Sequence, residues 1–228
     1  MRALRRVILV LVAATLVGAS LPTAALAACN PGRPNVVRAG FAGTQLTPAA
    51  WPRAVQTQIE EYSPFVFGSS EVSAWNMLNN GGTKWSQVGW WKENGVRWSF
   101  VQWTDNAGNW FTNFYSPAGV GTTPNYETIY NIASTDWIWE RNNQVLHTTN
   151  ALWQPKTVQI YGETHSKADQ MPGGVANHNT FREAHYIPNN GGAWLNIGAA
   201  AGTNDAVTYG ALKVNNEAYD IWDKACNS

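Results

Sequence analysis

The sequence predicts an all-β protein of the β-sandwich class, and three observations lead to this prediction. Short runs rich in aromatic and β-branched residues are separated by turns of Gly, Asn and Pro. No segment carries a convincing long helical period. The strand-like runs also lack intervening helices, which a parallel sheet would need. Together these features favour two antiparallel sheets packed face to face.

Residues 1–28 have the order of a secretory signal peptide. Three arginines precede an apolar run, and small residues follow it up to Ala27 and Ala28. The apolar run is shorter than the ~20 residues that a membrane-spanning helix needs. We therefore expect cleavage after Ala27 or Ala28 and a secreted, extracellular protein. No later segment has the apolar length of a span, which predicts a soluble mature chain.

The chain has two cysteines, Cys29 and Cys226. Two cysteines in an exported protein usually form a disulfide, and the ends of a domain often lie close together. The sequence therefore predicts a Cys29–Cys226 bridge. One alternative stays open at this point. The run 26–29 resembles a bacterial lipobox, in which Cys29 would be lipidated and held at a membrane while Cys226 stays unpaired.

The charge balance excludes some partners. Without residues 1–28 the chain keeps 12 basic and 15 acidic residues, a net charge near −3. This balance gives no basic footprint for nucleic acid and no polybasic patch for an anionic membrane. About 200 residues suit one all-β domain. We expect a monomer with no nucleic-acid partner and, unless Cys29 is lipidated, no membrane partner.

The order of elements follows from the same patterns. Residues 29–55 hold several prolines and little periodicity, so they predict an irregular lead-in strap before a domain over 56–228. The pair Asn94-Gly95 predicts a tight hairpin between 84–93 and 96–105. The candidate strands are 70–78, 84–93, 96–105, 109–116, 124–132, 135–141, 156–165, 180–187, 193–199 and 207–222.

Thirteen tryptophans in a chain with 13% charged residues are unusual. Strand alternation places aromatic rings on both faces of the predicted hairpin, with Trp91 on one face of 84–93 and Trp90 on the other. One face can enter the core. The other is too aromatic for ordinary exposure, which indicates either the floor of a groove or a surface covered by the strap.

No established nucleophile, phosphate-binding or metal motif occurs in the sequence. His165 could share a metal with Asp169 or Glu163, but no recognised ligand spacing joins them. We therefore expect neither a metal nor an organic cofactor.

The run 157–165 is the strongest candidate for chemistry. Alternation places Gln159, Tyr161, Glu163 and His165 on one face of a strand, while the intervening residues are suited to the core. A carboxylate among aromatic side chains is a typical setting for a general acid or base. The other interpretation is an ordinary solvated glutamate at the rim of a hairpin.

Several motifs resemble the neprosin family of glutamic peptidases. Gln87-Val88-Gly89-Trp90, followed by the run 96–105, resembles that family's Glu-Ala-Gly-Trp strand and its hairpin partner. The run 158–163 is similar to its Val-Gln-Trp-Gly-Gly-Glu. The runs 170–174 and 181–186 resemble two further motifs, and the order agrees over about residues 70–190.

The resemblance implies an antiparallel double-sheet β-sandwich, jelly-roll-like, with a concave groove. It also implies a secreted endopeptidase that cleaves polypeptides near proline with two glutamates. The second glutamate corresponds to Glu163. The first corresponds to Gln87, a departure that resembles instead the Gln/Glu pair of the eqolisin peptidases.

On this basis Gln87 and Glu163 are the predicted catalytic residues. The predicted substrate-binding residues are Trp91, Trp98, Gln102, Gln159, Tyr161 and His165.

Two other functions stay open. A carbohydrate-binding or polysaccharide-acting sandwich would use Trp91, Trp98, Trp103 and Trp110 as flat platforms for sugar rings. A non-catalytic relative would keep a peptide-binding groove without hydrolysis.

Overall fold

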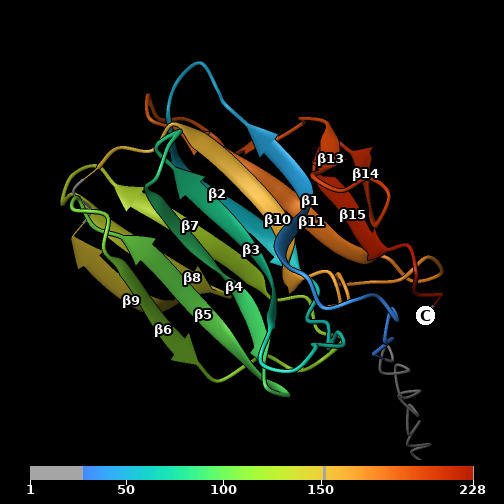
Figure 1. Cartoon of the computed structure of the whole chain (residues 1–228). Coiled ribbons are helices and arrows are strands. Elements are labelled where there is room, and N and C mark those ends of the chain that lie inside the picture. Colours follow the sequence, from blue (N-terminus) through green and yellow to red (C-terminus); the bar gives the residue numbers. More distant parts are fainter. Residues whose placement is uncertain (1–27, 151–152, 228) are drawn as a thin grey trace, which may run out of the picture.

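The computed structural model describes residues 28–150 and 153–227 (Figure 1). The predicted signal peptide falls almost entirely on residues 1–27, outside the described residues. The described part contains fifteen strands and no helix, and therefore no helix that could cross a membrane. The strands are β1 (Val37–Leu46), β2 (Pro52–Ile59), β3 (Glu71–Asn79), β4 (Trp85–Glu93), β5 (Val96–Thr104), β6 (Trp110–Tyr115), β7 (Asn125–Asn131), β8 (Asp136–Arg141), β9 (Gln144–Asn150), β10 (Thr157–Ser166), β11 (Asn179–Pro188), β12 (Leu195–Asn196), β13 (Ala201–Thr203), β14 (Tyr209–Asn215) and β15 (Ala218–Asp223).

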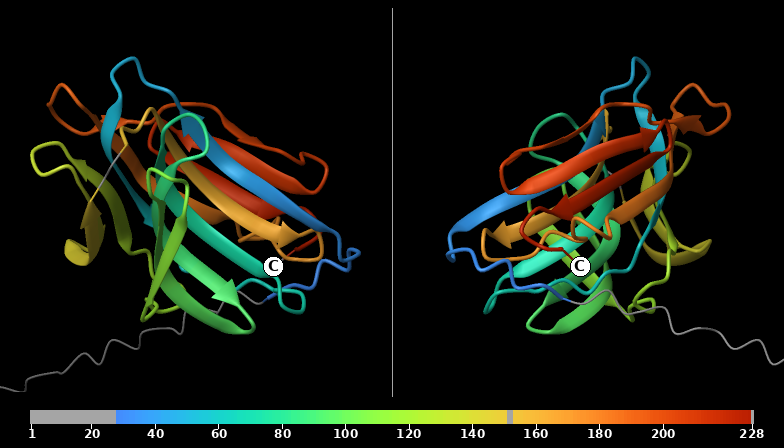
Figure 2. Two further views of the ribbon diagram at one scale, coloured as in Figure 1. Left: turned by 60° about the vertical axis from the view of Figure 1, so that its left-hand side comes forward. Right: turned by 90° about the vertical axis from the view of Figure 1, so that its right-hand side faces the viewer.

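The strands form two antiparallel sheets that pack face to face (Figure 2). The seven-stranded sheet has the order β13-β1-β10-β3-β4-β5-β6. The other has the order β14-β15-β11-β2-β7-β8-β9, with β12 added beside β11. Neighbours in each sheet pair antiparallel. The predicted β-sandwich class is confirmed.

Strand alternation decides which side chains enter the core. In β4, Val88 and Trp90 are fully buried in the cluster between the sheets. Gln87 and Trp91, on the opposite face of the same strand, line an open cavity instead. The two sheets thus bury a common core between them, while the other face of the seven-stranded sheet carries the open cavity.

The β4–β5 hairpin forms as predicted. Asn94 and Gly95 have φ values of 48° and 76°, the left-handed conformations that a two-residue hairpin turn needs. The turn fixes the register, so that Trp91 lies opposite Trp98 and Gln87 lies opposite Gln102. This local pairing places Gln87 and Gln102, two of the polar residues of the candidate site, side by side.

The prediction of an irregular strap over 29–55 was wrong for most of its length. β1 pairs with β10 inside the seven-stranded sheet, and β2 pairs with β7 and β11 in the other sheet. Pro48 and Pro52 fall at the junction between these strands, where a missing N–H costs little. Because β1 is hydrogen-bonded beside β10 within the same sheet, it does not lie over the aromatic face of β4 and β5.

Other strands differ from the predictions at the C-terminal end. The candidate strand 193–199 shortens to β12, and 207–222 divides into β14 and β15 around a turn at Asn216. β9 and β13 were not predicted. β9 follows β8 through a tight turn at Asn142 and Asn143, both with positive φ, so the sequence analysis missed the second strand of this hairpin.

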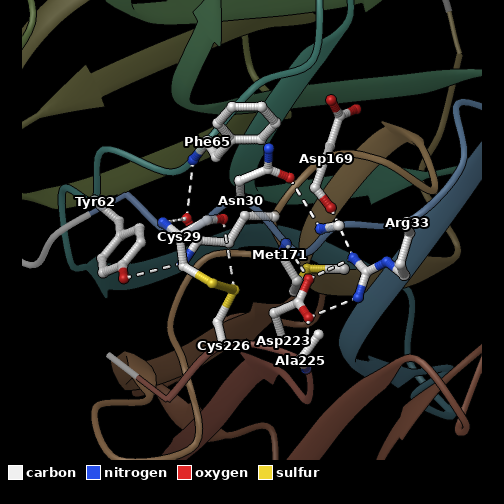
Figure 3. The surroundings of a disulfide bond; sticks show 12 residues. Cys29, Asn30, Arg33, Tyr62, Phe65, Asp169, Met171, Asp223, Ala225 and Cys226 are labelled. Carbon is white, nitrogen blue, oxygen red and sulfur yellow. Dashed lines mark hydrogen bonds and ion pairs between the residues drawn. A yellow bond between two sulfur atoms is a disulfide. The ribbon is translucent and has the colours of Figure 1, made fainter.

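The predicted disulfide joins the two ends of the described chain (Figure 3). The Cα atoms of Cys29 and Cys226 lie 5.7 Å apart, and 197 positions separate them in sequence. The bridge excludes lipidation of Cys29. Arg33 reinforces the same junction, since its guanidinium donates to both carboxylate oxygens of Asp223 and to the carbonyl of Asp169.

Candidate active site

The register of the seven-stranded sheet arranges side chains in rows across its free face. Gln87 and Glu163 stand in two different rows, on β4 and β10, with a third row between them. The row of Gln87 is Gln45, Gln159, Met77, Gln87, Gln102 and Thr112. The middle row is Gly43, Tyr161, Trp75, Gly89, Phe100 and Phe114. The row of Glu163 is Phe41, Glu163, Ser73, Trp91 and Trp98.

A cavity of about 310 Å³ opens on this face. It is the central part of what we call the groove. Both predicted catalytic residues line it, as do four of the predicted substrate-binding residues. The complete lining is Phe41, Glu71, Trp75, Met77, Trp85, Gln87, Trp91, Gln102, Trp110, Gln159, Glu163 and His165.

Two neighbouring cavities extend the groove. One, of about 460 Å³, shares Phe41, Trp75 and Gln159 with the central cavity and adds Tyr161. The other, of about 340 Å³, shares Glu71 and His165 and reaches the loop around residues 67–70. The groove therefore offers space on both sides of Glu163, as an extended polymer needs.

The remaining predicted residue, Trp98, does not line these cavities. Its ring packs against Phe114 at a centroid distance of 5.3 Å, beside the Trp91 ring. Trp91 itself contacts the His165 ring at 6.2 Å. Trp98 therefore packs among the neighbouring aromatic rings, while Trp91 forms part of the cavity surface.

Glu163 is held by two hydrogen-bond donors. The indole Nε1 of Trp75 donates to Oε2 over 2.9 Å, and His165 Nε2 lies 3.1 Å from Oε1. The side chain of Glu163 is 16% exposed. Each carboxylate oxygen can accept a second hydrogen bond. The carboxylate is thus fixed in orientation and still able to contact a water or a substrate.

His165 carries a positive charge in this arrangement. Its Nδ1 lies 2.8 Å from Glu71 Oε1, and its Nε2 lies beside Glu163. A neutral imidazole has one N–H, so it could donate to one of these carboxylates only. Although burial opposes the charge, hydrogen bonds to Glu163 and Glu71 raise the pKa of His165 to about 10. The side chain is 41% exposed, so solvent screens the pairs in part.

The amide of Gln87 is oriented by a chain of hydrogen bonds. The indole Nε1 of Trp85, which can only donate, donates to Gln102 Oε1 over 3.1 Å. The same oxygen accepts from Gln87 Nε2 over 2.9 Å. Gln102 Nε2 then faces Thr112. Because the indole fixes Gln102, it also fixes Gln87, whose Oε1 is buried and has no hydrogen-bond partner in the structure.

Gln87 and Glu163 are offset diagonally across the sheet. Gln87 lies opposite Met77, which lies opposite Gln159, four residues before Glu163 on β10. Trp75 stands at the midpoint of this diagonal, in the middle row. A group that touches both candidate residues must therefore lie above the Trp75 indole.

Several lining residues were not identified from the sequence. Glu71, Trp75 and Met77 come from β3, and Phe41 comes from β1. The alternation within 70–78 could have grouped Glu71, Trp75 and Met77 on one face. No sequence signal showed that β3 lies between β4 and β10, because that pairing joins segments far apart in the chain.

The other histidines lie outside the groove. His147 stacks on Trp103, His178 stacks on Trp222, and His185 pairs with Glu217. The carboxylate of Asp169 is not directed at His165. It accepts hydrogen bonds from the backbone N–H of Phe67 and the hydroxyl of Ser70. Among the residues that the structure describes, no group of three or more His, Cys, Asp and Glu side chains could hold a metal ion.

Comparison with known proteins gives a fold but no family. No family model matches the chain, and no curated protein matches it. Among solved structures, Scytalido-glutamic peptidase with a peptide-based transition-state analogue matches with a TM-score of 0.57 and 10% identity. That match covers 82% of this chain and 100% of the other. A second structure of the peptidase, with a transition-state analogue inhibitor, gives a TM-score of 0.54, 11% identity and the same coverage. At such identity the likeness shows a shared two-sheet fold.

Proposed function

We propose that the chain is a secreted glutamic peptidase in which Glu163 acts as a general base on water. The observation that carries the proposal is the setting of Glu163. Its carboxylate lines a cavity within an extended groove and is oriented by Trp75 and His165. The shared fold with a glutamic peptidase supports the same reading, as does the neprosin-like and eqolisin-like order of motifs.

The reaction needs no group beyond the side chains and water. Glu163 takes a proton from a water in the cavity, and the water oxygen bonds to the scissile carbonyl carbon. The resulting oxyanion accepts hydrogen bonds as charge develops. Glu163 then returns the proton to the leaving nitrogen while the C–N bond breaks. A carboxyl base of this kind favours mildly acidic pH.

Gln87 would complete the site across the Trp75 indole. Its fixed amide leaves Oε1 and one N–H uncommitted, because Gln102 occupies only one hydrogen. The remaining N–H can donate to the oxyanion, whereas the buried Oε1 does not face the attacking water in this orientation of the amide. Cleavage near proline remains a prediction of the family resemblance.

Export is part of the proposal. The Cys29–Cys226 disulfide is typical of proteins in oxidising compartments. The signal peptide predicted over residues 1–28 would supply the route.

The deciding experiment is proteolysis of a denatured, proline-rich protein by the purified chain at pH 3–5 and at pH 7. Glu163→Gln keeps the size of the side chain but removes proton transfer and replaces one of the two acceptor oxygens with a donor, so activity should fall at least ~10²-fold while the fold persists. Glu217→Gln is the matched control, because Glu217 also pairs with a histidine, His185, but outside the groove. Proteolysis that survives Glu163→Gln would reject the mechanism.

A carbohydrate-binding function is the second candidate, and Trp110 favours it. This ring lines the central cavity, is 69% exposed and contacts the Trp85 ring at a centroid distance of 4.9 Å. An exposed indole suits stacking on a sugar ring. Calorimetric titration with soluble oligosaccharides would test it. Sugar binding that Trp110→Ala removes, without proteolysis by the parent protein, would favour this function. Peptide binding without cleavage would indicate a non-catalytic relative.

A further inference from the structure

We infer that Glu71 is a positioning residue. It acts through His165 to hold the carboxylate of Glu163 in one orientation, beside a positively charged imidazole. The inference rests on the proposed peptidase function and assigns a role to a residue that the sequence did not single out.

The first step is geometric. Glu163 and His165 share the groove face of β10 because they are two residues apart. Glu163 lies opposite Ser73 on β3, so the next groove-facing position on β3, Glu71, lies beside His165. The pairing of β3 with β10 therefore creates the order Glu71, His165, Glu163, with the imidazole between the two carboxylates.

The second step concerns rotation. The Trp75 indole alone would leave Glu163 free to swing about one hydrogen bond. His165 supplies the second donor, but an imidazole held on one side only could itself turn. Glu71 binds the opposite ring nitrogen and fixes the ring plane. A small misplacement of a catalytic group can cost a large factor in rate, which gives this support a function.

The third step concerns charge. Both ring nitrogens face carboxylates, so the histidine must carry two protons to satisfy both. Glu163 and Glu71 are the charged groups that stabilise the imidazolium, while Glu93 lies across the β3–β4 ladder from Glu71. Loss of the Glu71 carboxylate removes one of the two charges that retain the second proton.

The imidazole ring lies between Glu71 and Glu163, so Glu71 influences the Glu163 carboxylate through His165. Glu93 is a close match for a control. It is a glutamate on the same face and in the same row, and no ion pair joins it to His165 among the described residues.

The experiment compares the parent protein, Glu71→Gln and Glu93→Gln. The titration midpoint of His165 is followed by ¹H–¹⁵N NMR of the imidazoles, assigned with His165→Asn. For Glu71→Gln we expect that midpoint to fall by at least ~1 pH unit. We also expect kcat on denatured casein at pH 4–5 to fall about tenfold with KM changed less than about twofold. Glu93→Gln should leave both unchanged.

The outcomes separate this inference from the proposed function. An active parent protein with unchanged kcat and His165 titration in Glu71→Gln overturns the positioning role and leaves the peptidase proposal intact. A parent protein without proteolysis overturns the proposed function and the positioning role of Glu71 in catalysis together, even if the His165 midpoint shifts. A fall in kcat without a shift of that midpoint also contradicts the inference, since a general structural defect would do the same.

Discussion

The indole nitrogen of Trp75 lies 2.9 Å from a carboxylate oxygen of Glu163, although the two residues are 88 positions apart in sequence. Trp75 belongs to β3 and Glu163 to β10, and the contact depends on the pairing of these strands in the middle of the seven-stranded sheet. The same indole stands between Glu163 and Gln87. Trp75 therefore contributes an orienting donor and separates the two candidate catalytic side chains.

The role of this donor predicts the effect of Trp75→Phe. The substitution keeps an aromatic ring in the floor of the groove and removes the N–H that orients Glu163. We expect kcat on a denatured protein substrate to fall about tenfold or more, with a smaller change in KM. Trp51→Phe is the control, because Trp51 packs on Tyr130 outside the groove. Equal activity of Trp75→Phe and the parent would show that the indole N–H is dispensable.

Gln87→Glu tests the second candidate residue. A glutamate there faces Gln102 Oε1, which already accepts from the Trp85 indole and cannot donate. A protonated carboxyl can donate to that oxygen, whereas an ionised one is repelled by it. We expect activity to be retained or raised in acid and lost towards neutrality, measured as kcat/KM from pH 3 to 8. Gln144→Glu on β9 adds the same charge at an exposed position. A pH profile identical to that of the parent would reject the predicted role of Gln87.

Gln87→Ala should give a smaller loss than Glu163→Gln, because it removes a hydrogen-bonding partner of the reaction and leaves the base in place. Removal of one oxyanion donor typically costs 10²–10³ in kcat. The measurement is kcat at the acidic optimum, with circular dichroism to show that the fold persists. Activity equal to that of the parent would contradict participation of the amide.

Thermal stability should fall as pH rises from about 4.5 to about 10. Burial raises the pKa of Glu61 to about 7 against the opposing Tyr126 hydrogen bond, and burial with the Glu140 charge raises the pKa of Glu127 to about 7. Between pH 4.5 and 7 the folded state therefore binds more protons than the unfolded state, so stability declines with pH. The raised pKa of His165 acts in the same direction. The stabilisation that the charged His165 gives the folded state is complete below about pH 6.5 and is lost as the pH rises through about 10.

Scanning calorimetry from pH 4.5 to 9.5 measures this trend. We expect Tm to drop by several degrees. In Glu127→Gln the decline between pH 4.5 and 7 should be shallower, because one of the two carboxyls with a raised pKa is gone. A Tm that rises over this range would contradict the assignment of these groups.

The disulfide should make a large contribution to stability. A bridge that closes a loop of this length contributes about 5 kcal/mol in the chain-entropy view. We expect the double variant Cys29→Ser with Cys226→Ser to unfold at markedly lower urea concentration than the parent. Arg33→Ala, which removes the ion pair with Asp223, tests the second link at the same junction. Equal unfolding midpoints for the parent and the double cysteine variant would show that the bridge adds little.

The sequence by itself determined the features that depend on local pattern. Alternation assigned Gln87 and Trp91 to one face of β4 and Trp90 to the other, and Asn94-Gly95 set the register of β4 against β5. The cysteine count predicted the bridge between the ends. Each of these follows from the backbone preferences of a few neighbouring residues or from the chemistry of a single pair.

The tertiary structure decided the rest, because the pairing of distant strands is not encoded in any short pattern. Insertion of β3 between β4 and β10 brings Glu71 to His165 and Trp75 to Glu163. Pairing of β1 with β10 turned an apparently irregular strap into part of the sheet and left the aromatic face open. Such contacts become favourable only when two sheets bury their common core, so the surroundings of Glu163 depend on the whole fold.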